Sequence, residues 1–576
     1  MDAPKVILPN ELLLAILEQL VADPYADKNH ALSLRTTCRL FDKALKPVTL
    51  RTLQLEYTRL DKTERSARPP DDNALRRVGH FCRALYLDMM VMRDIGEVNY
   101  LKQAFARVPQ MHPFIYMLSE RYCLNEFSFT EIEYYNRLAS MLEHTPNVTA
   151  VRLNLPFQLL SQHCRAATMI LGNTLKALLQ RPEESATVET LVIDNLTDLT
   201  LYKLWRNPVD VANFSTILGR LKHLLVSVRR HDDCPHSRFE VAFYLWEMLL
   251  KAKQLESLCL VGLDVNDKSE LKTTTERQTK FVGWQNRAMP LSSYRVSLLA
   301  TLNITYLELR SLEIHPADLL DLFRIVSGSL KELYLDHVYL KSLVAGNRST
   351  PERGVSYWVG PPNIPPPITG AVWVAPRLRE MIRDLRVCRA TNLGYDRYLD
   401  GTWARPLNEA PTYDIADPCG LSRSLSQRFV EVVFGMKQPD APDGSPIIHL
   451  PPEEDYQHGT GNGQEQPLLH PPLSPPPQLP SYSIAKPPQA CKKGKWWDAA
   501  SYLATPHNPT SSWQRSIDGF FPNCNETTLE RLQAFADEAY DGMQLVSELH
   551  RQDEEIEGSG AAMPTAAPPN SPLIYE

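Results

Sequence analysis

One apolar pattern, repeated nine times, limits what this chain can fold into. The motif apolar-x-x-apolar-x-apolar recurs between residues 50 and 387, and each copy ends in the alternation of a short strand with one buried face. The copies are Leu50/Leu53/Leu55, Cys82/Leu85/Leu87, Val148/Val151/Leu153, Val188/Leu191/Ile193, Leu221/Leu224/Val226, Leu255/Leu258/Leu260, Ile304/Leu307/Leu309, Leu330/Leu333/Leu335 and Ile382/Leu385/Val387.

Helical stretches precede most copies. They are predicted at 130–143, where Thr130 and Glu133 form a capping box, and at 158–179, 239–252 and 316–326. Helix followed by strand, repeated, predicts an α/β fold of parallel strands with helices stacked on one side. The pattern is that of a curved leucine-rich-repeat solenoid over 49–435, with irregular spacing that requires insertions. The alternative is a doubly wound sheet, which the lack of a glycine-rich phosphate loop after the first strand disfavours.

The N-terminal segment, 5–48, predicts a helical hairpin. Pro9 suits a first helical turn, and the apolar residues that follow recur three and four positions apart. A second block at 32–45 has the same spacing. So small a unit cannot bury all its apolar surface, which indicates a partner. The candidate contact residues are Leu8, Pro9, Leu12, Leu13, Ile16, Leu17, Leu20, Leu34 and Phe41.

This hairpin resembles the F-box. In that family Leu-Pro-x-Glu-Leu-Leu, here Leu8 to Leu13, opens the first helix, and the motif docks on a Skp-type adaptor of a cullin ubiquitin ligase. Thr37, Cys38 and Phe41 stand where the family carries Val, Ser and Trp. With the repeats, residues 5–390 resemble the F-box/leucine-rich-repeat proteins of filamentous fungi. The resemblance implies an SCF substrate-recognition subunit that recruits a protein substrate and performs no chemistry itself. The alternative is a non-catalytic interaction scaffold that joins no ligase.

Strand alternation also predicts a recognition face. In each copy the residues on either side of the middle apolar position point away from the core, onto the concave face of the solenoid. Tyr and Arg dominate binding hot spots, which favours part of this set as substrate anchors. The candidates are Arg152, Tyr306, Glu308, Tyr334 and Arg386. The alternative is a substrate site on the inserted Pro/Trp loop, 342–376, which carries Trp358 and Trp373.

Composition excludes several other functions. The net charge of -7 argues against nonspecific nucleic-acid binding as the main activity. Ten cysteines without a CxxC pair indicate reduced thiols, as in a cytoplasmic or nuclear protein. Polar residues interrupt any secretion signal, and no apolar run is long enough for a membrane span.

The sequence motifs predict no enzyme activity. The sequence has no GxSxG, Walker, HExxH or RING-like pattern. The segment His231-Asp232-Asp233-Cys234-Pro235-His236 contains metal-ligand types, but zinc needs a second ligand group at defined spacing, so we interpret it as a solvated turn. No cofactor or metal is expected.

The chain after residue 435 divides into a Pro-rich linker at 436–495, predicted to be disordered, and a tail segment at 496–556. Within the tail, 527–549 predicts an amphipathic helix, weakened by Gly542, for which docking onto the open end of the solenoid is the simplest role. Residues 557–576 are predicted to be disordered.

Overall fold

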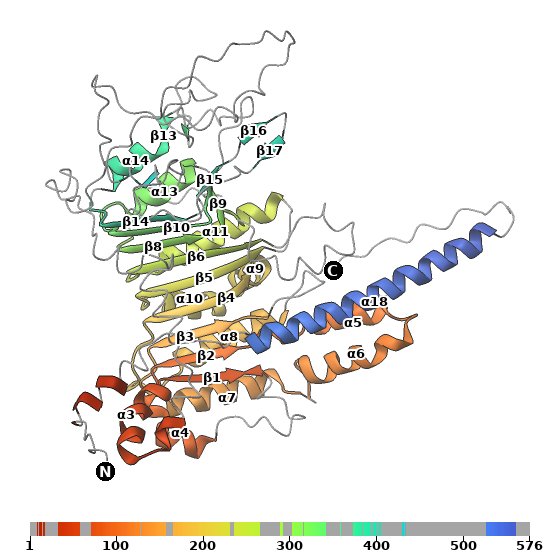
Figure 1. Ribbon diagram of the computed structural model, residues 1–576, viewed down its shortest axis with the longest axis horizontal. Coiled ribbons are helices and arrows are strands. Elements are labelled where there is room, and N and C mark those ends of the chain that lie inside the picture. Colours follow the sequence, from red (N-terminus) through yellow and green to blue (C-terminus); the bar gives the residue numbers. More distant parts are fainter. Residues whose placement is uncertain are drawn as a thin grey trace, which may run out of the picture.

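The computed structural model shows an α/β protein in which parallel strands lie side by side in the order of the sequence (Figure 1). It describes residues 9, 11–13, 15–17, 33–57, 71–126, 128–156, 165–230, 235–264, 289–291, 302–314, 316–340, 357–358, 372–382, 384–391, 393–395, 397–399, 402–404, 429–430, 433 and 526–559.

A nine-stranded parallel sheet forms the centre of the molecule. Its order follows the sequence, so each strand adds beside the one before it: β1 Thr52–Glu56, β2 Ala84–Asp88, β3 Ala150–Asn154, β4 Thr190–Thr197, β5 His223–Arg230, β6 Ser257–Asp264, β8 Tyr306–Arg310, β10 Glu332–Asp336 and β14 Val387–Thr391. A doubly wound sheet reverses its order at a switch point. The doubly wound alternative is therefore wrong.

The helices cover one face of this sheet. One core cluster joins the inward strand leucines to the apolar sides of the helices, and neighbouring helices contact each other. The helices are α4 Asp72–Val78, α7 Glu131–His144, α8 Arg165–Leu179, α9 Asp198–Arg206, α10 Pro208–Leu218, α11 Pro235–Lys251, α13 Pro316–Val326 and α14 Val374–Met381. The predicted capping box is confirmed, because Thr130 Oγ1 accepts from the Glu133 N–H and Glu133 accepts from the Thr130 N–H. The opposite side of the sheet is called the outward face below.

The strand register confirms eight of the nine predicted copies and corrects the last. Leu53, the middle residue of the first copy, pairs with Leu85, and the alignment continues strand by strand to Leu333. Leu333 then pairs with Cys388, not with Leu385. The ninth copy is therefore Leu385/Cys388/Ala390, three residues later than predicted. The error arose because Ile382, at the end of α14, offered an equally apolar starting point.

Residues with left-handed backbone lie at the ends of two strands and within a third. Asn195, Ser311 and His337 have φ of 60°, 51° and 53°, a region that non-glycine residues rarely occupy. Ser311 and His337 are equivalent in register and lead into a second, four-stranded sheet of β7 Met289–Leu291, β9 Leu312–Ile314, β11 Tyr339–Leu340 and β15 Gly394–Tyr395. Asn195 is the extra residue where the pairing of β4 with β5 shifts.

The longest insertion lies between β2 and β3. It carries α5 Ile95–Ala104, η3 Pro109–Met111, α6 His112–Met117 and the π-helical turn η4 Leu118–Tyr122. Asp94 ties it to the main helix layer, since its carboxylate accepts from the N–H groups of Gly96 at the start of α5 and Ala166 at the start of α8. A buried ion pair, Arg93 to Glu97, lies beside this junction.

A C-terminal helix packs on that insertion. Helix α18, Glu526–Ser559, includes the predicted 527–549 and extends ten residues further, so residues 557–559 are helical and not disordered. Figure 1 shows it running alongside α5 from the edge of the sheet. It therefore docks near the N-terminal end of the sheet, through the insertion.

The remaining predictions, for residues after 341, concern segments that are only partly described. The Pro/Trp loop is shorter than predicted, because α14 begins at Val374. Its two tryptophans lie on paired short strands, β12 Tyr357–Trp358 and β13 Val372–Trp373, and β12 contacts α13. A further hairpin pairs β16 Arg397–Leu399 with β17 Thr402–Ala404. The Pro-rich linker at 436–495 lies outside the described residues.

Candidate functional site

An apolar surface is exposed on the N-terminal hairpin. Residues 11–13, 15–17 and 33–35 are helical, followed by α3 Arg39–Thr49, which contacts the 3₁₀ turn η2 Gly79–Phe81. Leu12 and Ile16, one helical turn apart on the same face, are 53% and 51% exposed. Val48 at the end of α3 is also exposed.

Two other apolar side chains of the hairpin are buried. Leu17 is 5% exposed and Leu45 is buried, while the Arg35 guanidinium donates to Asp42 and to Thr49 Oγ1. Leu17 was predicted to contact a partner, but the structure places it inside the chain, because it lies on the opposite side of the helix from Leu12. Of the other candidates, Pro9 is exposed and Leu13, Leu34 and Phe41 are half-buried. Leu8 and Leu20 lie outside the described residues.

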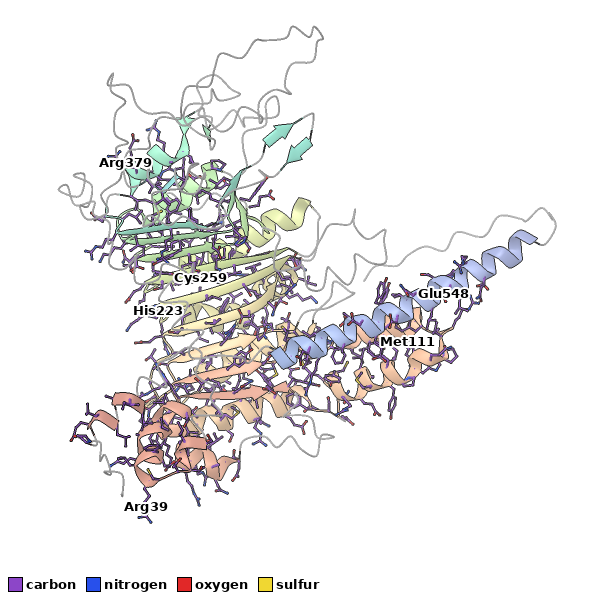
Figure 2. The ribbon with its side chains drawn as sticks, viewed as in Figure 1. Arg39, Met111, His223, Cys259, Arg379 and Glu548 are labelled. Atoms are coloured by element: carbon purple, nitrogen blue, oxygen red, sulfur yellow. The ribbon has the colours of Figure 1, made fainter. Side chains whose placement is uncertain are left out.

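The outward face of the sheet holds all the predicted substrate anchors except Arg386. Residues flanking the middle apolar position do point away from the helix layer, where they form clusters separate from the main core. These clusters contain Ala84, Tyr86, Ala150, Val192, Leu225 and Cys259 on one stretch, and Tyr306, Tyr334 and Val387 on the other. His223 and Cys259 mark the middle of this face in Figure 2.

Three predicted anchors are buried in one cluster. Tyr306 and Tyr334 are 6% and 7% exposed and stack with ring centroids 5.1 Å apart. The Tyr306 hydroxyl donates to Glu308 at 2.6 Å, and the Tyr334 hydroxyl donates to Glu332 at 3.1 Å. Burial, followed by the adjacent Glu332 charge, raises the pKa of Tyr334. These side chains are therefore packed with each other, which strand alternation alone could not reveal.

The other two predicted anchors lie apart from this cluster. Arg152 is partly exposed and donates to Asp194 at 2.6 Å, with its guanidinium 5.4 Å from the Tyr86 ring. Arg386 is exposed but precedes β14, so its predicted position on the outward face is wrong. The register places Val387 and Arg389 there.

Two similar ion pairs mark the accessible part of the outward face. Arg152 of β3 pairs with Asp194 of β4, and Arg310 of β8 pairs with Asp336 of β10 at 3.2 Å. Burial opposes ionisation of Asp336, but the hydrogen bond from His337 and the Arg310 charge outweigh it and lower its pKa. Each pair links neighbouring strands and remains partly exposed, so this face offers both charges to a partner.

A buried polar network, not predicted from the sequence, lies at the carboxyl ends of β2 to β5. Asn154 Nδ2 donates to Asp88 at 3.0 Å, Asn195 Nδ2 to Asn154 at 2.7 Å, and Arg229 to Asn195 at 2.7 Å. From α18, the Thr528 hydroxyl donates to the other Asp88 oxygen at 2.8 Å. The sequence did contain a signal for this network, because polar residues such as Asp88 and Asn154 directly follow the alternating apolar residues of their strands.

Burial sets the charge state of this network. It raises the pKa of Asp88 to about 6, and the nearby Glu56 charge acts in the same direction. Hydrogen bonds to Asp88 from Thr528, the Met90 N–H and Tyr86 oppose that shift. Burial also lowers the pKa of Arg229. Asp88 therefore becomes protonated within a mildly acidic range.

The described residues contain no group of three or more His, Cys, Asp and Glu side chains arranged to hold a metal ion. Among the helices in the described ranges, none is long and apolar enough to cross a membrane. No family model matches the chain, and no curated protein is significantly similar to it.

Proposed function

We propose that this chain is the substrate-recognition subunit of a cullin-type (SCF) ubiquitin ligase. The N-terminal hairpin would bind a Skp-type adaptor as an F-box does, and the parallel sheet with its one-sided helix layer would act as an irregular leucine-rich-repeat solenoid that binds a protein substrate. The chain would act by proximity, holding substrate near the ubiquitin-charged enzyme, in the cytoplasm or nucleus.

The observation that carries this proposal is the exposure of Leu12 and Ile16 on a hairpin whose Leu17 and Leu45 are buried. About half of each of the two exposed side chains is in contact with water. A partner that buried them would gain from removing apolar surface from water, which is the main driving force in protein association. The outward face, with its two partly exposed Arg–Asp pairs, supplies a second surface on a different part of the chain.

Adaptor titration tests this proposal. Leu12→Ala with Ile16→Ala should weaken binding to a Skp-type adaptor by about 2 to 3 kcal/mol, or roughly 30- to 150-fold, because about half of each side chain remains to be buried. The control is Ile132→Ala, which shortens an even more exposed apolar side chain on α7. An unmodified chain that binds no adaptor, or a folded double variant that binds as tightly as the unmodified chain, would contradict the assignment.

A further inference from the structure

Helix α18 presents a continuous contact seam to the insertion between β2 and β3. Its inward residues are spaced three and four apart over most of its length: Leu532, Phe535, Ala539, Gly542, Val546 and Leu549. Leu532, Phe535 and Ala539 are buried in the main core cluster, and Val546 and Leu549 pack against it. Alternating three- and four-residue spacing is the pattern by which helices pack along one another.

The insertion provides a matching surface, the α18 groove, formed by Phe105, Met111 and Tyr122. Phe535 packs edge-on against Tyr122, with centroids 4.7 Å apart. At Gly542 a Cβ would lie 2.7 Å from Met111 Cε and 2.8 Å from Phe105 Cζ, so a larger residue there would force these two side chains to shift or α18 to move away. Met111 lies beside α18 in Figure 2.

Both ends of this contact are polar. At the start of α18, Thr528 donates to Asp88 on the outward side of β2. At the far end, Asp553 accepts from Arg107 at 2.5 Å. The two contacts join positions 440 and 446 residues apart in the sequence.

We propose that α18 is a releasable intramolecular ligand of the α18 groove and that, when docked, it masks the β2 end of the outward face. Glycine within a helix weakens the free helix, and Gly542 lies at the contact of α18 with Met111 and Phe105. We therefore expect helix formation to be coupled to docking, so that α18 opens as one local unit. If α18 masks this face, it would compete with substrate, and this regulatory consequence rests on the proposed function. The docking of α18 itself does not rest on the proposed function.

A binding assay in trans tests the docking. The probe is a fluorescent synthetic peptide of residues 526–559, added to the full chain carrying Gly542→Leu, which displaces its own α18 while raising its helix propensity. This variant should bind the probe roughly a hundredfold more tightly than the unmodified chain, whose groove is filled. The full chain carrying Glu548→Leu, a change on the exposed side of α18, should behave as unmodified.

Hydrogen exchange tests the masking in the same variants. Amides at 86–90 should exchange faster in the Gly542→Leu chain, while those at 306–310 should not change. Equal probe binding by the variant and the unmodified chain, or a folded Gly542→Leu chain that binds no probe, would overturn the docking. Binding of a probe peptide that itself carries Gly542→Leu would also overturn the docking. Unchanged exchange at 86–90 would overturn the masking. Neither assay contains adaptor or substrate, so each can fail independently of the proposed ligase function.

Discussion

The two ends of the outward face are buried by different means, although one strand pattern builds both. At β2 to β5, a chain of amide and carboxyl groups is closed by Thr528, a residue more than 400 positions away. At β8 and β10, Tyr306 and Tyr334 stack on each other and donate to glutamates two residues away on their own strands. The first end therefore depends on a distant segment, and the second depends on adjacent strands.

The comparison indicates that strand register determines which side chains share a face of the sheet but does not determine how exposed those side chains are. Tyr86 and Tyr334 occupy equivalent outward positions. Tyr86 lies beneath an arginine and beside a buried carboxylate, whereas Tyr334 lies against another tyrosine. Perturbing one end should therefore leave the other intact.

The largest effect should follow from removing the main α18 anchor. Phe535→Ala deletes a buried ring packed on Tyr122 and should cost about 3 to 5 kcal/mol, because a core cavity is added to the lost burial. Hydrogen exchange should locate the loss in α18 and α5, with β8 and β10 still protected. Ile132→Ala on α7, an exposed site, serves as the control. Equal loss of protection at both ends would show that the sheet unfolds as one unit.

The next effect is a pH dependence confined to the β2 end. The folded pKa of Asp88 is about 6 against an ordinary value of 3.8, so the folded chain keeps a proton that the unfolded chain has lost. The stability from this group is complete below about pH 3.8 and falls as the pH rises to about 6, by up to roughly 3 kcal/mol. Asp88→Asn should remove this decline. Urea unfolding of both chains between about pH 4 and 7 measures the difference, and parallel pH profiles would show that Asp88 is not the group responsible.

A smaller effect is expected at the tyrosine end. Tyr306→Phe removes the donor to the buried Glu308 and should cost about 1 to 3 kcal/mol, since a buried acceptor loses a partner. Tyr334→Phe is the matched control, because its acceptor, Glu332, is half-buried and should tolerate the loss better. Thermal unfolding compares the two variants. A larger loss from Tyr334→Phe would show that ring stacking, and not the hydroxyl bond, organises this cluster.

The sequence predicted the sheet well because its signal is local. In eight copies, apolar spacing alone identified the inward residues that the structure pairs across neighbouring strands. The ninth copy was wrong because the end of α14 and the start of β14 are both apolar, so spacing could not separate them. The excess apolar surface of the hairpin was also predicted, since an apolar stripe wider than a small hairpin can bury must remain partly outside. The sequence did not single out Leu12 and Ile16 among the candidates, however, because the buried Leu17 belongs to the same stripe.

The amino-acid sequence was therefore enough to predict the alternation of helix and strand, the side-chain directions in the first eight copies and the excess apolar surface of the hairpin. Which outward residues are buried followed from the fold alone, because burial depends on neighbours brought together across the sheet. The fold also gave Gly542 a second role, since this glycine weakens a helix taken alone but leaves room for Met111 and Phe105 beside α18. Local propensity acts within a few residues, whereas the contact of α18 with Asp88 spans 440 positions and leaves no periodicity in the sequence.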